Sequence, residues 1–229
     1  MIPSPLTGEG QGEGGLMAEP GSTLRTLIGV VGYSPLVEAF PLGPALMRRL
    51  EAAAEQRSGL AIENMTWSPI HIVQRFEDGS LAADRLVLIG AADACGEPGR
   101  ITCWRWGGGS LPPAVLQERI YEAVTGIVSL DNTLVIGEHF GVWPNQVMTV
   151  EIEMGPQTFG EIVMAEAEGA ADRASLLARL GFDPFAAGEQ LARLALRAAE
   201  GTDVEPRPKS AASLAPHPSF SHTRAVRTG

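Results

Sequence analysis

Apolar and polar positions follow two periodicities in turn along the middle of the chain, and this pattern predicts strands that alternate with helices. Leu24–Val31 and Leu86–Ala91 are short apolar runs, typical of strands that are buried on both faces. Between them, Gly43–Gln56 has Leu46 and Leu50 at helical spacing with charged residues on the opposite face. A strand–helix–strand unit of this kind is typical of an α/β protein.

The same pattern continues to about residue 201. Further strands are expected at Leu60–Trp67, Arg100–Trp106 and Gln146–Glu153, and further helices at Pro112–Val128, Ala170–Leu180 and Phe185–Glu200. Alternation at this spacing predicts an α/β sandwich with a largely parallel central sheet flanked by helices. In such sheets the functional site normally lies beyond the carboxyl ends of the strands.

The two ends of the chain differ in composition from the middle. Residues 1–22 are rich in glycine with little to bury, which predicts a flexible N-terminal extension, and residues 202–229 are rich in proline, serine and alanine, which predicts a disordered tail. The folded domain is therefore expected at 23–201. The total net charge is −10, but the first 22 residues hold three acids and no base and residues 206–229 hold four bases and no acid, so 23–205 carries −11.

Charge and composition exclude several classes of function. An acidic body lacks the basic stripe that nucleic-acid binding needs. No apolar run reaches the roughly 18 residues of a membrane span, and no signal peptide is recognisable, which together favour a cytoplasmic protein. Cys95 and Cys103 are not in a CxxC pair and are expected to be free thiols.

No established catalytic or nucleotide motif is present: the chain lacks GxGxxG, the P-loop, GxSxG and HExxH. Glu38 follows the first predicted strand and Asp93 follows Leu86–Ala91, so both belong to the carboxyl edge of the sheet. Paired carboxylates there could bind a metal or transfer protons, or they could cap helices and face solvent. His139, in a predicted connection before Trp143, is the one histidine of interest for a site.

Several segments together resemble the hydrogenase maturation proteases, which remove a C-terminal extension from the large subunit of NiFe hydrogenases. Leu27–Gly43 is similar to the family's opening strand and loop, of the type LxxGxGNPLxxDDGxG. Asp84–Ile101 is similar to its central segment, of the type DxxxxxDAxxxGxxPGxI, and Gly141–Gly160 with Phe185–Glu200 to its last third. The resemblance spans nearly all of 24–201 and implies a three-layer sandwich of the phosphorylase/hydrolase-like type with a largely parallel, mixed sheet.

The departures from the family pattern concern its metal site. The resemblance implies three ligands: an acid in the first loop, an aspartate at the end of the central strand and a histidine further on. Here only Glu38 remains of the paired acids, Gly90 takes the place of the aspartate with Asp93 three residues later, and Ser129–Asp131 takes the place of the histidine, with His139 further along. Donors moved this far should abolish a metal site unless Glu38, Asp93 and His139 form a displaced one.

Three functions follow from these observations. The first is a non-proteolytic accessory that binds a hydrogenase large-subunit precursor or its maturation factors. No cofactor of its own is then expected, and the client's nickel is the one metal it would meet. The second is an active metal-dependent endopeptidase with the displaced site, and the third is an α/β binding domain unrelated to hydrogenase. Trp104, Trp106 and Trp143 are candidate partner contacts, because tryptophan is enriched in binding hot spots, or packing anchors.

Overall fold

The computed structural model describes residues 24–35, 37–92, 96–126, 128–155, 173–202 and 206–214. In these ranges a six-stranded sheet has the order β2-β1-β3-β5-β4-β6. Its strands are β1 (Thr26–Val31), β2 (Leu60–Met65), β3 (Arg85–Ala92), β4 (Ile101–Trp106), β5 (Gln146–Glu153) and β6 (Arg207–Lys209). Strands β2, β1, β3 and β5 are parallel, whereas β4 runs antiparallel to β5 and carries β6 parallel to itself at the outer edge.

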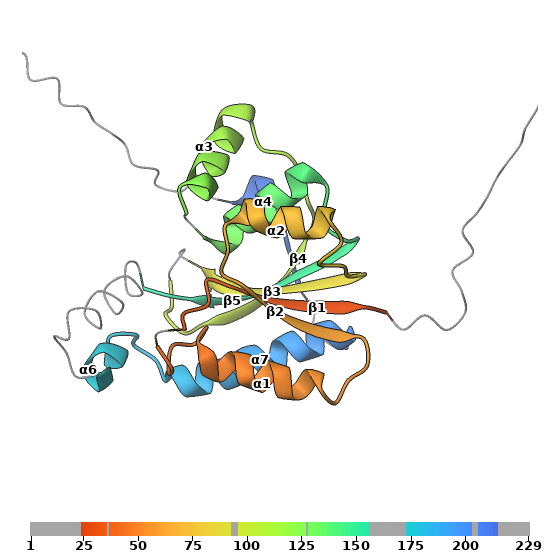
Figure 1. Cartoon of the computed structure of the whole chain (residues 1–229). Coiled ribbons are helices and arrows are strands. Elements are labelled where there is room, and N and C mark those ends of the chain that lie inside the picture. Colours follow the sequence, from red (N-terminus) through yellow and green to blue (C-terminus); the bar gives the residue numbers. More distant parts are fainter. Residues whose placement is uncertain are drawn as a thin grey trace, which may run out of the picture.

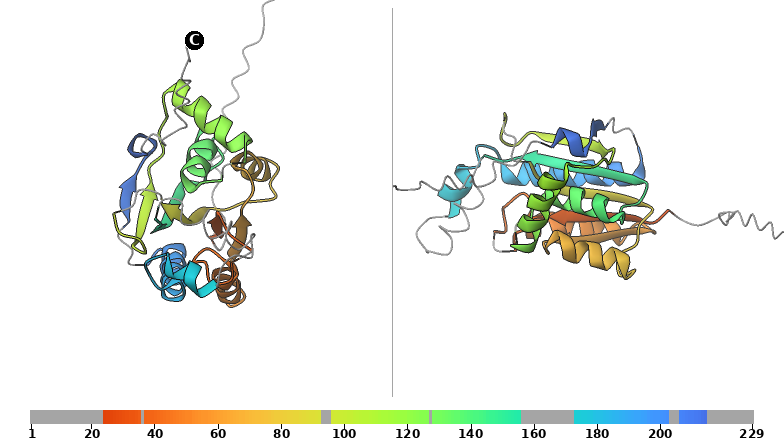
Figure 2. Two further views of the ribbon diagram at one scale, coloured as in Figure 1. Left: turned by 90° about the vertical axis from the view of Figure 1, so that its left-hand side faces the viewer. Right: turned by 90° about the horizontal axis from the view of Figure 1, so that it is seen from above.

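Helices cover both faces of the sheet and make three layers (Figure 1). One face is covered by α1 (Pro44–Ala54) and α7 (Pro184–Glu200), and the other by α2 (Pro69–Glu77), α3 (Pro113–Val124) and α4 (Leu130–Phe140). A short helix, α6 (Arg173–Ala178), lies to one side, and the 3-10 turn η1 (Ala211–Ser213) follows β6 (Figure 2).

The core consists of two apolar layers, one on each face of the sheet. Strand β3 lies between them, and its residues from Leu86 to Ile89 are fully buried, as expected of a parallel strand covered on both faces. On the α1/α7 side, α7 presents a row of small side chains to the sheet, which allows the helix to approach closely. These buried alanines are Ala187, Ala192, Ala195, Ala198 and Ala199.

The structure confirms the α/β fold with a mostly parallel, mixed sheet. Strand β5 has the bounds expected from its alternation, and β1, β2, β3, β4, α1, α3 and α7 lie within a few residues of their predicted ranges. The helix expected at Ala170–Leu180 is seen as α6, and its first residues lie outside the described ranges.

Two helices were not foreseen by the apolar pattern. Helix α2 begins at Ser68-Pro69, where the serine hydroxyl caps the backbone N–H of His71 and proline occupies the first turn. Helix α4 has a glycine, Gly137, in its interior and buried polar residues near its start, so its helical period is weak. The expectation that His139 lies in a connection is therefore wrong, because it lies in the last turn of α4.

The expectation of a disordered tail from residue 202 does not hold for residues 206–214. Strand β6 pairs with β4, with Trp104 opposite Arg207 and Trp106 opposite Lys209. Proline is tolerated in β6 because this is an edge strand. The buried ion pair of Lys209 with Glu151 and the buried side chain of Ala211 hold the segment in place. Amino-acid composition alone indicates neither contact.

Candidate functional site

The carboxyl edge of the sheet begins with the loop after β1. Strand β1 ends at Val31, Gly32 turns the chain with a positive φ of 74°, and the loop closes where the backbone N–H of Ser34 donates to the carbonyl of Leu42 at 3.2 Å. Glu38 lies in this loop, as predicted, and its carboxylate forms an ion pair with Arg48 of α1. The charge and hydrogen bond of Glu38 raise the pKa of the Arg48 guanidinium. Arg48 of the following helix, α1, therefore holds the Glu38 carboxylate.

The end of β3 is packed by an apolar side chain. A Cβ atom placed on Gly90 would lie 2.8 Å from the Cβ and 3.0 Å from the Cδ2 of Leu130, the first residue of α4. Leu130 is only 3 % exposed, so it fills the space beside the strand. An aspartate at position 90 would not fit unless Leu130 moved. Asp93, the alternative carboxylate, lies outside the described residues.

The first turn of α4 is fixed by hydrogen bonds within the protein. Ser129 caps the helix by accepting from the backbone N–H of Asn132 at 3.1 Å. The Asn132 side chain is fully buried, accepts from Arg119 at 3.0 Å and donates to Glu122 at 2.9 Å, both on α3. Asp131 accepts from Lys209 at 2.9 Å. The polar side chains around Leu130 therefore have partners already.

His139 lies at the opposite edge of the sheet from Glu38. Helix α4 starts beside Gly90 near the carboxyl end of β3, and His139 comes nine residues later, about 13 Å along the helix axis. The chain then enters β5 at Gln146, which pairs with Arg85 at the amino end of β3. His139 lines a cavity of about 270 Å³ there, beside Glu138. Glu38 and His139 thus do not share a site.

The residues present do not fit the metal centre that the resemblance implies. Among the described residues no group of three histidine, cysteine or acidic side chains could hold a metal ion. Gly90 takes the place of the aspartate, and the segment Ser129–Asp131, which takes the place of the histidine, offers only Asp131, which is bound by Lys209. Glu38, in the first loop, is paired with Arg48. Glu38 and His139 lie at opposite edges of the sheet, so they do not belong to one metal site. A role for Asp93 stays a prediction, because this residue lies outside the described ranges.

Two carboxylates that sequence reasoning missed lie at the carboxyl end of β5. Glu153 is 7 % exposed and accepts hydrogen bonds from the backbone N–H groups of Gly96 and Glu97 at 3.1 and 3.0 Å and from Arg100. Burial raises the pKa of Glu153, but these donors lower it by more, so its pKa is below the usual range. Glu153 anchors the loop between β3 and β4.

Glu151, two residues earlier, accepts from the Nζ of Lys209 at 2.8 Å and from the Thr149 hydroxyl at 2.5 Å. Burial lowers the pKa of Lys209, but Asp131 and Glu151 raise it by more, which leaves its pKa above the ordinary value. The signal in the sequence was the position of Glu151 and Glu153 on either side of Ile152 at the end of a buried strand. Their role at this edge is structural.

The three candidate partner-binding tryptophans are placed differently from one another. Trp106 is 8 % exposed and donates through Nε1 to Glu138 at 2.9 Å, and Trp143 lies against Gly137 and donates to the carbonyl of Leu134 at 2.9 Å. Both are packing anchors, so the expectation of a partner contact is wrong for Trp106. Trp104 is half-buried beneath Arg207 and remains a candidate contact.

Cys103 is a free, buried thiol on β4, as expected. Burial, with a smaller effect of Glu151, raises its pKa to about 11, so the thiolate that reacts as a nucleophile is scarce at neutral pH. Cys95 lies outside the described residues. The described part of the chain therefore offers no cysteine nucleophile.

Comparison with known proteins found structural similarity without sequence matches. No family model matches the chain, and no curated protein sequence matches it. The chain is similar to the solution structure of an endopeptidase from Escherichia coli (21 % identity, TM-score 0.35), over 70 % of this chain and 96 % of the other. It is also similar to a hydrogenase 2 maturation peptidase from Thaumarchaeota archaeon SCGC_AB-539-E09 (15 % identity, TM-score 0.29), over 64 % of this chain and 99 % of the other.

Among the described residues no helix is long and apolar enough to span a membrane.

Proposed function

We propose that this chain is a non-proteolytic, hydrogenase maturation protease-like protein that binds the large-subunit precursor of a NiFe hydrogenase, or one of its maturation factors, as an assembly accessory. The observation that carries the proposal is the contact of Leu130 with Gly90. Gly90 stands where the resemblance implies an aspartate, and Leu130 belongs to the segment Ser129–Asp131, where it implies a histidine. The other segments of the chain keep the order of that family.

The kind of atoms at this edge supports the loss of peptidase chemistry. A metal centre needs oxygen or nitrogen donors held at about 2.0–2.2 Å, and methyl and methylene groups supply none. Leu130 also excludes water from the space beside Gly90 because it is packed in the core.

The neighbouring surface at the same edge suits a protein partner. A small groove of about 80 Å³ lies between the loop after β1 and the start of α7 and is lined by Glu38, Phe40 and Phe185, among others. Phe185 is 61 % exposed, which is unusual for a large aromatic residue. Aromatic side chains at a groove are frequent binding hot spots. We place the client polypeptide here.

The proposal is tested by capture of the client from a strain that expresses a NiFe hydrogenase. The tagged chain should retain the large-subunit precursor with its C-terminal extension intact. Phe185→Ser should reduce capture, whereas Tyr121→Ser should not, because Tyr121 is similarly exposed at 71 % but lies on α3 across the sheet. Capture of no hydrogenase component would instead support an α/β binding domain without a hydrogenase role.

The active-endopeptidase alternative makes an opposite prediction for metal binding. A ligand that binds only the folded state raises the melting temperature. With Ni²⁺ or Cd²⁺ we expect the melting temperature of the wild-type chain either to stay unchanged or to shift as much as that of Glu38→Gln. A shift that disappears in this variant would overturn the non-proteolytic account.

A further inference from the structure

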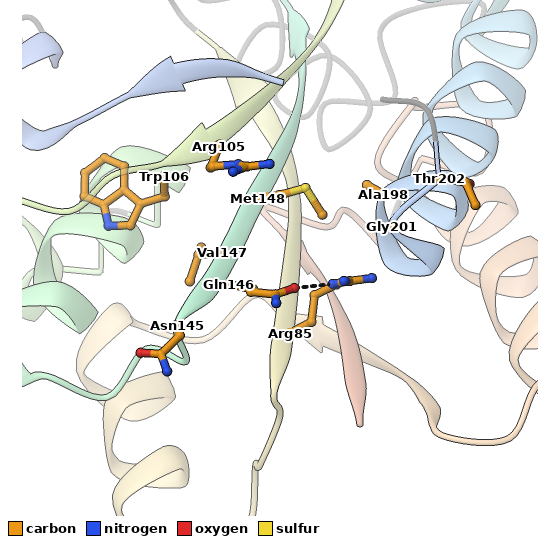
Figure 3. A pocket seen from close by; sticks show the side chains of 10 residues that line it. All are labelled: Arg85, Arg105, Trp106, Asn145, Gln146, Val147, Met148, Ala198, Gly201 and Thr202. Atoms are coloured by element: carbon orange, nitrogen blue, oxygen red, sulfur yellow. Dashed lines mark hydrogen bonds between the residues drawn. The ribbon is translucent and has the colours of Figure 1, made fainter. Parts of the chain in front are cut away.

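A cavity of about 330 Å³ lies at the amino edge of the sheet, across the molecule from the carboxyl edge (Figure 3). It is formed where β3, β5 and β4 begin or end beside the C-terminus of α7. Its polar side chains include Arg85, Arg105, Asn145, Gln146 and Thr202, and Met148 and Ala198 form an apolar wall. The volume is in the lower range of small-molecule sites.

The strand register explains why the two arginines share this cavity. Arg85 on β3 pairs with Gln146 on β5, and Arg105 on β4 pairs with Met148, two residues further along β5. Since residues two apart lie on one face of a strand, all four side chains project from the face that α7 covers. The two arginine Cα atoms are about 12 Å apart by strand spacing, a span that two long guanidinium side chains can bridge around one small ligand.

The guanidinium groups of Arg85 and Arg105 differ in their contacts. Arg85 donates to the carbonyl of Ala199 at 2.7 Å and to Gln146 Oε1 at 2.8 Å, so it neutralises the last turn of α7 and orients the amide. Arg105 is exposed and has no hydrogen-bond or ion-pair partner among the residues that the structure describes. With its Oε1 facing Arg85, Gln146 has its amide N–H groups left to donate.

The charge of this cavity is opposite to that of the protein. The chain carries −10, yet among the described residues that line the cavity none is an acid and two are arginines. A planar guanidinium binds a carboxylate or phosphate through two parallel hydrogen bonds, and such charge-assisted bonds are the stronger ones. Arg105 has no acceptor among the described residues, and an anion in the cavity would supply one.

We propose that this cavity binds a small oxyanion, a phosphate or a carboxylate group, with Arg105 as the main charged contact and Gln146 as a neutral donor. The apolar wall of Met148 and Ala198 then contacts the body of the ligand. This site is separate from the proposed client surface, which lies at the opposite edge of the sheet, and the two proposals can fail independently.

The test is titration of the full chain with inorganic phosphate and, separately, with succinate, at constant ionic strength, followed by calorimetry. Saturable binding of either anion is expected, and the tighter of the two identifies the group. Arg105→Gln should weaken binding by about tenfold to a hundredfold. Arg193→Gln should leave it unchanged, because Arg193 is an exposed arginine on α7 outside the cavity.

Two results would overturn the proposal: neither anion binds the wild-type chain, or Arg105→Gln and Arg193→Gln weaken binding equally, which would indicate general charge attraction. Chemical modification of the wild-type chain gives a measurement that does not depend on a variant. The bound anion should protect Arg105, and not Arg193, from phenylglyoxal, as read by peptide mass spectrometry. Equal modification of both arginines with and without the anion would also contradict the site.

Discussion

Replacing Lys209 by methionine removes the cation that holds the C-terminal strand β6 to the rest of the sheet. The Nζ of Lys209 lies 2.9 Å from Asp131 and 2.8 Å from Glu151, and the side chains of Lys209 and Glu151 are 12 % and 6 % exposed. Methionine keeps the length of the side chain and its packing. The variant therefore leaves the buried Glu151 carboxylate without its counter-charge, with the Thr149 hydroxyl as its remaining donor among the described residues.

The expected loss of stability is at the lower end of the range for such a change. Breaking a buried ion pair from one side costs about 3–5 kcal/mol. Asp131 is 36 % exposed and can be rehydrated, so its share is small and Glu151 dominates. We expect a loss of about 3 kcal/mol, which corresponds to about 6–12 °C in melting temperature for a domain of this size.

Urea unfolding of four variants measures this effect: Lys209→Met, Glu151→Gln, the double variant of the two, and the control Arg25→Gln. Lys209→Met with Glu151→Gln should be less destabilised than Lys209→Met alone, because no buried charge is then left unpaired. Arg25→Gln, which breaks an ion pair with 62 % and 42 % exposed side chains, should change stability by no more than about 0.5 kcal/mol. A loss below about 1 kcal/mol in Lys209→Met would refute the reasoning, as would a double variant whose loss is the sum of the two single losses.

Three further predictions concern other buried groups. Leu130→Ala should cost about 2–5 kcal/mol in urea unfolding because it leaves a cavity beside Gly90, and a neutral result would contradict the packing. Cys103, with its pKa of about 11, should resist iodoacetamide at pH 8 in the folded state and react in denaturant, as followed on its own peptide so that Cys95 does not interfere. The lowered pKa of Glu153 stabilises the fold above the unfolded value of 4.5, and this contribution disappears as pH falls through the lower folded value. The stability difference between Glu153→Gln and wild type should therefore shrink as pH falls below about 4.5, and a constant difference would argue against this role.

The sequence was sufficient for the elements that have strong periodicity and clear ends. Strand β5 could be placed to the residue because its apolar and polar positions alternate. Helix α7 could be placed to within one residue, and in the structure Asp183 caps it and Gly201 ends it. Helix α4 escaped detection since its buried Asn132 is satisfied by Arg119 and Glu122 of another helix. A polar residue at a core position looks like loop until its tertiary partners are known.

The candidate site shows the same limit. That Gly90 lacks a donor is visible in the sequence, but that Leu130 fills the resulting space depends on where α4 begins, which only the tertiary structure gives. His139 was chosen for its residue type, and the direction of α4 then places it at the wrong edge. Arg85 and Arg105 line one cavity because β4 lies beside β5 in the sheet although it precedes β5 by two helices in the chain. No local sequence pattern predicts this strand order.

The central claim, binding of a hydrogenase large-subunit precursor without cleavage, is tested most directly by native mass spectrometry of the purified chain mixed with that precursor. The account predicts a complex in which the precursor keeps its full mass, with Ni²⁺ present or absent. A precursor shortened by its C-terminal extension would contradict the loss of peptidase activity. The absence of any complex would contradict the binding role itself.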